Sequence, residues 1–162
     1  MQTLIWENLM RVRERIDAAA RKAGRRLEEI TLIGVSKTQP AAAIREAFEA
    51  GLRHFGENRV QEWEGKGKEV EDLRARWHLI GHLQSNKAAR AARLFHCVDS
   101  IDDFALAQRL DRAMAESSSA EKLRVLMRFI SRKKKRRAGP RLRNYRLWHQ
   151  RSQNCHDWNW RG

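Results

Sequence analysis

Ile30-Thr31-Leu32-Ile33-Gly34-Val35-Ser36-Lys37-Thr38 is a short, apolar and β-branched stretch that predicts a buried strand. The next residues, 40–50, favour a helix, since Pro40 suits the first helical turn. A lysine at the carboxyl end of a buried parallel strand lies where α/β folds build their active sites. Apolar walls around Lys37 would favour its free amine, the form that Schiff-base chemistry needs. A second interpretation stays open, in which Lys37 only marks the exit of the strand to solvent.

Strand-like and helical patterns alternate along the chain after this first unit. Further strands are expected at 52–56, 77–80, 95–99 and 123–130. Helical patterns are expected at 58–70, 84–94 and 101–115, and an amphipathic helix at 3–23 precedes all of them.

The alternation predicts the fold class. Strands that are apolar on both faces and alternate with helices indicate a parallel sheet with helical cover, so the chain is α/β. A complete (β/α)₈ barrel takes about 250 residues, and this chain has 162. We therefore expect an incomplete TIM-type barrel of about five βα units. Ser100 and Asp103 resemble a capping box before the 101–115 helix.

Charge divides the chain into two parts. Of its 34 Lys and Arg residues, 12 lie in 128–162, together with only one of its 20 acidic residues. The net charge of +14 therefore belongs mainly to the tail. We predict a partial barrel domain over residues 1–130, and a basic tail over 131–162 that forms no stable part of the core, because it has no strand or helix periodicity.

Polar motifs follow three successive strands. They are Val35-Ser36-Lys37-Thr38, the run 55–62 (FGENRVQE) and the run 77–87 (WHLIGHLQSNK). The carboxyl ends of barrel strands converge in space, so Lys37, Asn58 and His82 are expected at one rim. Alternatively, Asn58 only caps a helix and His82 only satisfies a turn.

These three motifs, in this order, closely resemble the pyridoxal-phosphate homeostasis protein family over about residues 5–127. The resemblance implies a barrel of the alanine racemase N-terminal type. It also implies that Lys37 binds pyridoxal 5′-phosphate (PLP) through a Schiff base, with Asn58 near the cofactor and His82 as a neighbour. The family acts in intracellular vitamin B6 and amino-acid homeostasis and has no established enzymatic activity, so we expect a binding protein, not an enzyme.

The chain departs from the family pattern after about residue 127. Residues 123–127 fit a fifth strand, but the basic run 132–137 follows in place of the polar residues of relatives. The late loops that hold the cofactor phosphate in relatives are missing. We therefore expect a truncated and frameshifted chain in which PLP binding is impaired.

Two other functions stay open. An amino-acid racemase would share the barrel, but it needs a second acid or base opposite the lysine, and the only tyrosine, Tyr145, lies in the tail. The tail could instead bind nucleic acid without sequence specificity, since Lys133–Arg137 can neutralise phosphates; no specific nucleic acid is expected.

Cysteine content and hydropathy complete the expectations. Cys97 fits the core, and neither it nor Cys155 has metal-ligand spacing, so no metal is expected. No apolar run is long enough to span a membrane and no signal peptide precedes the domain, which indicates a cytoplasmic protein. An open barrel exposes strand edges, so we expect a monomer or nonspecific association.

Overall fold

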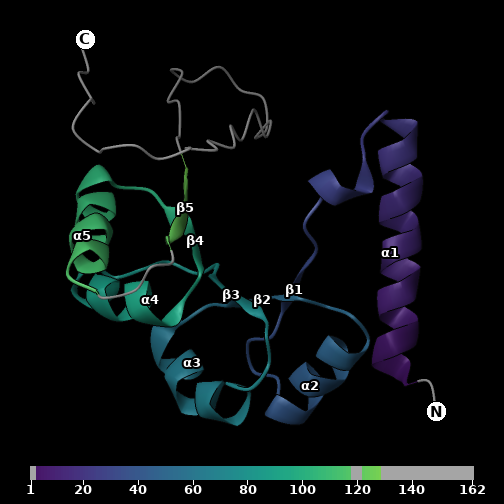
Figure 1. Cartoon of the computed structure of the whole chain (residues 1–162), viewed down its shortest axis with the longest axis horizontal. Helices are drawn as coiled ribbons and strands as arrows, with labels where there is room; N and C mark the ends of the chain where they lie inside the picture. The colour runs from purple at the N-terminus through teal and green to yellow at the C-terminus, as the bar shows by residue number, and fades with distance from the viewer. Residues whose placement is uncertain (1–2, 118–121, 129–162) are drawn as a thin grey trace, which may run out of the picture. The chain divides into compact units, whose positions relative to one another are not determined.

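Five parallel strands form one sheet in the computed structural model of this chain, which describes residues 3–117 and 122–128. The strands are β1 (Ile33–Val35), β2 (His54–Glu57), β3 (Arg76–Leu79), β4 (Cys97–Ile101) and β5 (Arg124–Met127). Each pairs with the next in parallel, in chain order. Within the described residues β1 and β5 are the two edges of the sheet (Figure 1). The predicted α/β class and incomplete barrel are confirmed.

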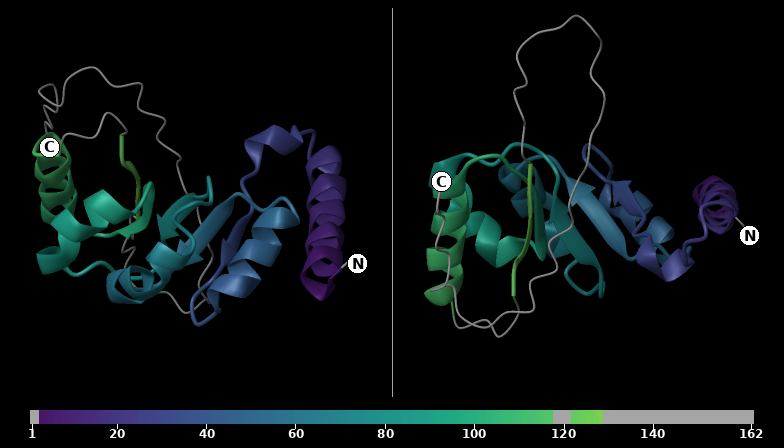
Figure 2. Two further views of the ribbon diagram at one scale, coloured as in Figure 1. Left: turned by 60° about the horizontal axis from the view of Figure 1, so that its bottom comes forward. Right: turned by 90° about the horizontal axis from the view of Figure 1, so that it is seen from above.

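Helices connect the strands and cover one side of the sheet. They are α1 (Leu4–Lys22), α2 (Ala41–Glu49), α3 (Val60–Lys66), α4 (Ala88–Leu94) and α5 (Phe104–Ala115), with 3₁₀ turns η1 (Leu27–Glu29), η2 (Gly67–Glu69) and η3 (Ser85–Lys87). Parallel neighbours need a crossover connection, and α2 to α5 supply it. Figures 1 and 2 show these four helices on the same side of the strands.

Most predicted helices are confirmed, but the one expected over 58–70 is shorter. The α-helix α3 ends at Lys66, and the chain continues as the 3₁₀ turn η2. Gly65 and Gly67 lie at this point. Glycine has poor helix propensity because it loses the most backbone entropy on ordering, which accounts for the early end of the α-helix.

The predicted capping box at Ser100 is wrong. Strand β4 runs to Ile101, so Ser100 lies within it, and its hydroxyl donates to the carbonyl of Gly81. The residue that caps α5 is Asp103, whose carboxylate accepts from the amide of Ala105 at 3.1 Å. Asp is as good an N-cap as Ser, and the strand pairing of β4 decides between them.

The core lies between the sheet and its helices. Trp77 of β3 has its ring centroid 3.9 Å from that of Trp63 on α3 and 5.2 Å from that of Phe55 on β2. All three side chains are buried. Cys97 is buried too, as predicted from its apolar context.

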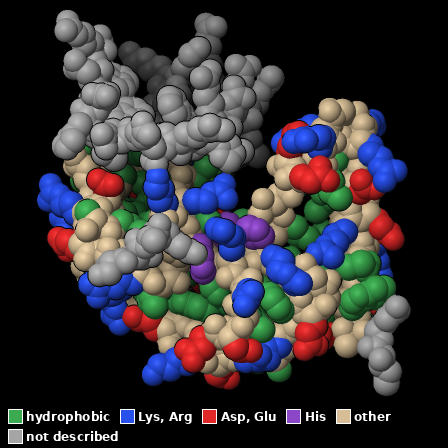
Figure 3. Space-filling model, in the orientation of Figure 1, with side chains coloured by type: hydrophobic (Ala, Val, Ile, Leu, Met, Phe, Trp, Pro, Cys, Tyr) green, Lys and Arg blue, Asp and Glu red, His purple; other side chains and the backbone are tan. Residues whose placement is uncertain are grey.

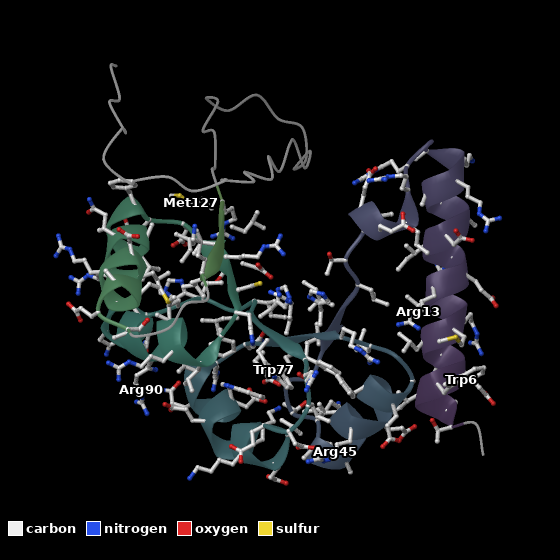
Figure 4. The ribbon with its side chains drawn as sticks, viewed as in Figure 1. Trp6, Arg13, Arg45, Trp77, Arg90 and Met127 are labelled. Atoms are coloured by element: carbon white, nitrogen blue, oxygen red, sulfur yellow. The ribbon has the colours of Figure 1, made fainter. Side chains whose placement is uncertain are left out.

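Helix α1 packs beside α2. Arg13 of α1, labelled in Figure 4, donates to the carbonyl of Gly51 at 2.6 Å and to that of Ala50 at 3.4 Å. These carbonyls follow the end of α2, where a cation is favourable. None of the helices in the described ranges is long and apolar enough to cross a bilayer.

The predicted tail lies outside the described residues. The same holds for Tyr145, for Cys155 and for the basic run Lys133–Arg137, to which the sequence assigned a possible nucleic-acid function. The described residues belong to the unit Met1–Phe129.

We expect Trp77→Ala to lower the free energy of unfolding by about 3–5 kcal/mol, because it removes a buried aromatic ring from the centre of the core. Trp77 is 4% exposed. Phe104→Ala is the control, since Phe104 is 61% exposed and its loss should change stability little. Urea unfolding followed by circular dichroism measures both, and equal effects of the two substitutions would contradict the placement of the core.

Candidate functional site

Lys37 lies at the carboxyl end of β1. The ladder to β2 extends one residue past the strand, since the amide of Ser36 donates to the carbonyl of Gly56 at 2.9 Å. A turn follows, in which the amide of Gln39 donates to the carbonyl of Ser36 at 3.0 Å. Thr38 has a φ of 62°, a left-handed conformation that is uncommon for a non-glycine residue. Such strained positions are held by their surroundings and often lie at functional sites.

Both neighbours of Lys37 are held by side chains from β2 and α3. The hydroxyl of Ser36 donates to Oε1 of Glu57 at 2.6 Å. Nζ of Lys66 donates to the carbonyl of Ser36 at 2.8 Å. On the other side, the amide of Thr38 donates to Oε1 of Glu62. The backbone on either side of Lys37 is therefore fixed.

The side chain of Lys37 itself is exposed and has no hydrogen bond or ion pair within the described part of the chain. The expected apolar walls are absent there. Val35, two residues earlier, is 51% exposed, because no described strand lies beyond the β1 edge of the sheet. The amine of Lys37 is thus accessible to a reagent from solvent, on a backbone that cannot move freely.

A buried ion pair supports this arrangement. Oε1 of Glu57 lies 3.0 Å from Nζ of Lys66, and the two side chains are 0% and 12% exposed. Glu62 lies further from the same ammonium, at 3.7 Å. The second oxygen of Glu57, Oε2, has no hydrogen-bond partner and is fully buried. Burying a carboxylate is costly unless it is paired, so Lys66 is essential to this position.

Asn58 and His82 lie in loops that touch. A Cβ on Gly81 would collide with the backbone carbonyl of Asn58, so only glycine fits there. The amide of Ile80 donates to the carbonyl of Glu57 at 2.9 Å, which ties the same two loops. Asn58 is half-buried and His82 is exposed.

The structure thus brings the three predicted residues to the same edge of the sheet, the carboxyl ends of β1, β2 and β3. Asn58 and His82 share a pair of contacting loops. No hydrogen bond joins Lys37 to either of them within the described residues. Their roles toward a cofactor remain predictions.

Sequence reasoning missed the residues that hold Lys37 in place. These residues are Glu57, which is fully buried, Ser36, which is 5% exposed, and Lys66, whose side chain is 12% exposed. The only local signal was an acid directly after the apolar residues of the second strand, since carboxylates are seldom buried without a partner.

A second polar network crosses the other face of the sheet. Phe55 and Trp77 point to the helices, so their chain neighbours His54 and His78 lie on the opposite face. Nδ1 of His54 is 2.9 Å from Nε2 of His78, whose Nδ1 is 2.8 Å from Oδ2 of Asp99. Histidine side chains gather near the middle of the face shown in Figure 3, with Lys and Arg beside them.

The two histidines titrate in opposite directions. Burial alone would lower the pKa of His78, but the hydrogen bond to Asp99 and the proximity of Cys97 outweigh it and raise this pKa to about 9. The pKa of His54 is lowered by burial, by His78 and by the charges of Arg76 and Arg124. Near neutral pH, His78 is therefore the charged donor and His54 the neutral acceptor.

No three His, Cys, Asp or Glu side chains within 3–117 and 122–128 are grouped as a metal ion would require.

We expect Glu57→Gln to lower the free energy of unfolding by about 3–5 kcal/mol, because it leaves Lys66 without its buried counter-charge. Lys66→Met should be similarly costly. The double substitution should cost less than the sum of the two, since no unpaired charge remains. Arg45→Gln breaks the exposed pair with Asp72 and serves as the control with little effect. Additive effects in a double-mutant cycle of urea unfolding would contradict the pairing.

The raised pKa of His78 predicts a pH-dependent stability. The contribution of protonated His78 to the free energy of unfolding is complete below its ordinary pKa of 6.5, and it is lost as the pH rises through about 9. The lowered pKa of His54 acts in the opposite sense, with stability present above 6.5 and lost as pH falls through the lowered value. Between about pH 6 and pH 10, the stability difference between the native chain and His78→Gln should therefore shrink by about 2 kcal/mol, less than the full pKa difference would give, because solvent screens part of the interaction.

Urea unfolding at several pH values measures this difference. His82→Gln is the matched control, because His82 is exposed and lies outside the network. If this stability difference stays constant over the same pH range, then the raised pKa of His78 is wrong and its folded-state hydrogen bonds do not involve a protonated imidazole.

Comparison with known proteins gives consistent relatives, although no family model matches the chain. A pyridoxal phosphate homeostasis protein of Pseudomonas aeruginosa is 52% identical over 106 residues, which are 65% of this chain and 46% of the relative. The protein of the same name from Escherichia coli K12 is 49% identical over 110 residues, 66% of this chain and 47% of the relative. The chain thus spans about half the length of the curated relatives it matches.

Similar solved structures agree with the curated relatives. PipY of Synechococcus elongatus, determined with PLP bound, has a TM-score of 0.54 and 51% identity, covering 62% of this chain and 48% of PipY. The structure of an unknown protein from Bifidobacterium adolescentis has a TM-score of 0.61 and 30% identity, covering 75% of this chain and 58% of that protein. Over about two thirds of its length, this chain is therefore a relative, in sequence and in fold, of the pyridoxal phosphate homeostasis proteins.

Proposed function

We propose that this chain binds PLP in vitamin B6 and amino-acid homeostasis in the cytoplasm, with Lys37 as the covalent anchor. One observation carries the proposal: the amine of Lys37 is exposed and unengaged among the described residues, while the residues on both sides of it are held by Glu57, Lys66 and Glu62. The names of the relatives and the PLP bound to PipY support the choice of ligand.

The residues present suit an aldehyde ligand. PLP supplies an electrophilic aldehyde carbon, with which a primary amine forms a Schiff base. Lys37 offers that amine at the end of a paired strand, and its fixed backbone lowers the entropy lost on binding. Asn58 and His82 come from the two touching loops at the same edge of the sheet and offer hydrogen-bond donors and acceptors.

We favour PLP binding without catalysis over amino-acid racemase activity. Racemisation requires an acid or base on the face of the cofactor opposite the lysine. The relatives are named for homeostasis and not for a reaction, and Tyr145, the only tyrosine of the chain, lies outside the described residues. We therefore propose a binding protein without catalysis of its own.

Borohydride reduction tests the anchor. After incubation with PLP and reduction, the native chain should carry the label on the tryptic peptide 27–45, because a modified Lys37 is no longer cleaved. We expect Lys37→Ala to lose this label.

Lys68→Ala is the control, since Lys68 is also an exposed lysine in the described residues. It should leave the labelling of the 27–45 peptide unchanged. Equal labelling of several surface lysines in the native chain, or an undiminished total label in Lys37→Ala, would overturn the proposal. Peptide mass spectrometry reads out both results without any assay of activity.

A further inference from the structure

A hollow lies between the start of α3 and the turn that follows β3. Its volume is about 400 Å³, which is within the range of small-molecule sites. Its polar lining consists of two cations, two amides and an imidazole: Arg59, Lys87, Gln61, Gln84 and His82. Lys37 and Asn58 are not among the residues that line it, so the hollow is distinct from the proposed anchor and shares only His82 with the proposed PLP neighbours.

The hollow has an uncompensated positive charge. No carboxylate lines it. The side chains of Arg59 and Lys87 form no ion pair or hydrogen bond with any residue that the structure describes. By contrast, Arg90 on the neighbouring surface is paired with Glu64 at 2.6 Å. An anion would therefore enter the hollow without displacing an existing partner.

The floor of the hollow is apolar and rigid. Val60 and Leu83 line it and are 3% and 2% exposed, because both belong to the core. The two loops around it are joined where Gly81 contacts the backbone of Asn58. A turn also holds Lys87, whose amide donates to the carbonyl of Gln84 at 2.9 Å. The polar groups are thus presented by a frame that exists before any ligand arrives.

We propose that this hollow binds a small phosphomonoester. The guanidinium of Arg59 can contact two phosphate oxygens at once, and Lys87 adds a point charge. The amides of Gln61 and Gln84 and the imidazole of His82 can donate further hydrogen bonds. Inorganic phosphate would fill only part of the volume, whereas an organic group can lie against Val60 and Leu83.

Isothermal titration of the full chain with phenyl phosphate, at constant ionic strength, tests the site. Saturable binding of one equivalent is expected, with inorganic phosphate weaker. Arg59→Gln and Lys87→Gln should each weaken binding about tenfold, the effect of losing a hydrogen bond to a charged group. Gln84→Glu should weaken it further by repulsion, and because Gln84 is exposed this substitution should not disturb the fold.

Arg93→Gln is the matched control for nonspecific attraction by this basic chain. Arg93 is exposed on α4 but does not line the hollow. Equal weakening by Arg93→Gln and Lys87→Gln would overturn the proposal, as would the lack of saturable binding. Lys37→Ala should bind phenyl phosphate as the native chain does, and its failure to do so would place the anion at the anchor instead. Failed labelling of Lys37 would overturn the proposed anchor and leave this site intact.

Discussion

Parallel pairing of the strands in chain order is the constraint on which the rest of this structure depends. Each strand lies beside the next, in the order β1 to β5. Consecutive parallel strands need a crossover, so a helix must lie between each pair, and the apolar sides of strand and helix then share one core. The carboxyl ends of all strands come to one edge as a consequence, which is why three motifs far apart in the chain lie there.

The same constraint explains where charge is buried. The buried polar cluster contains Ser36 after β1, Glu57 at the end of β2 and Lys66 at the end of α3. Only the pairing of β1 with β2 brings these residues together. The cost of burying Glu57 is offset by the ammonium of Lys66 and the hydroxyl of Ser36. In return, the backbone beside Lys37 is held in one conformation while its amine stays in solvent. Rigid support under an exposed functional group is typical of binding sites, and the proposed anchor, Lys37, has such support.

Much of the fold could be predicted because its signals are local. The alternation of β-branched runs with helical periods located all five strands and the main helices to within a few residues. The errors came where two local signals compete. Ser100 and Asp103 are both good helix caps, and the pairing of β4 up to Ile101 makes Asp103 the cap. The helix predicted over 58–70 ended at Lys66 because glycine weakened it.

The sequence by itself determined the class of fold, the order of its units and the position of Lys37 at a strand end, since hydrophobic periodicity and residue type are properties of neighbouring residues. Only the tertiary structure decided which groups meet: Glu57 with Lys66, His54 with His78 and Asp99, and the cations Arg59 and Lys87 around one hollow. The physical reason is that these contacts depend on register and burial across different strands and loops. Local patterns predict which residues are buried, but they do not set the register between elements that are distant in the sequence.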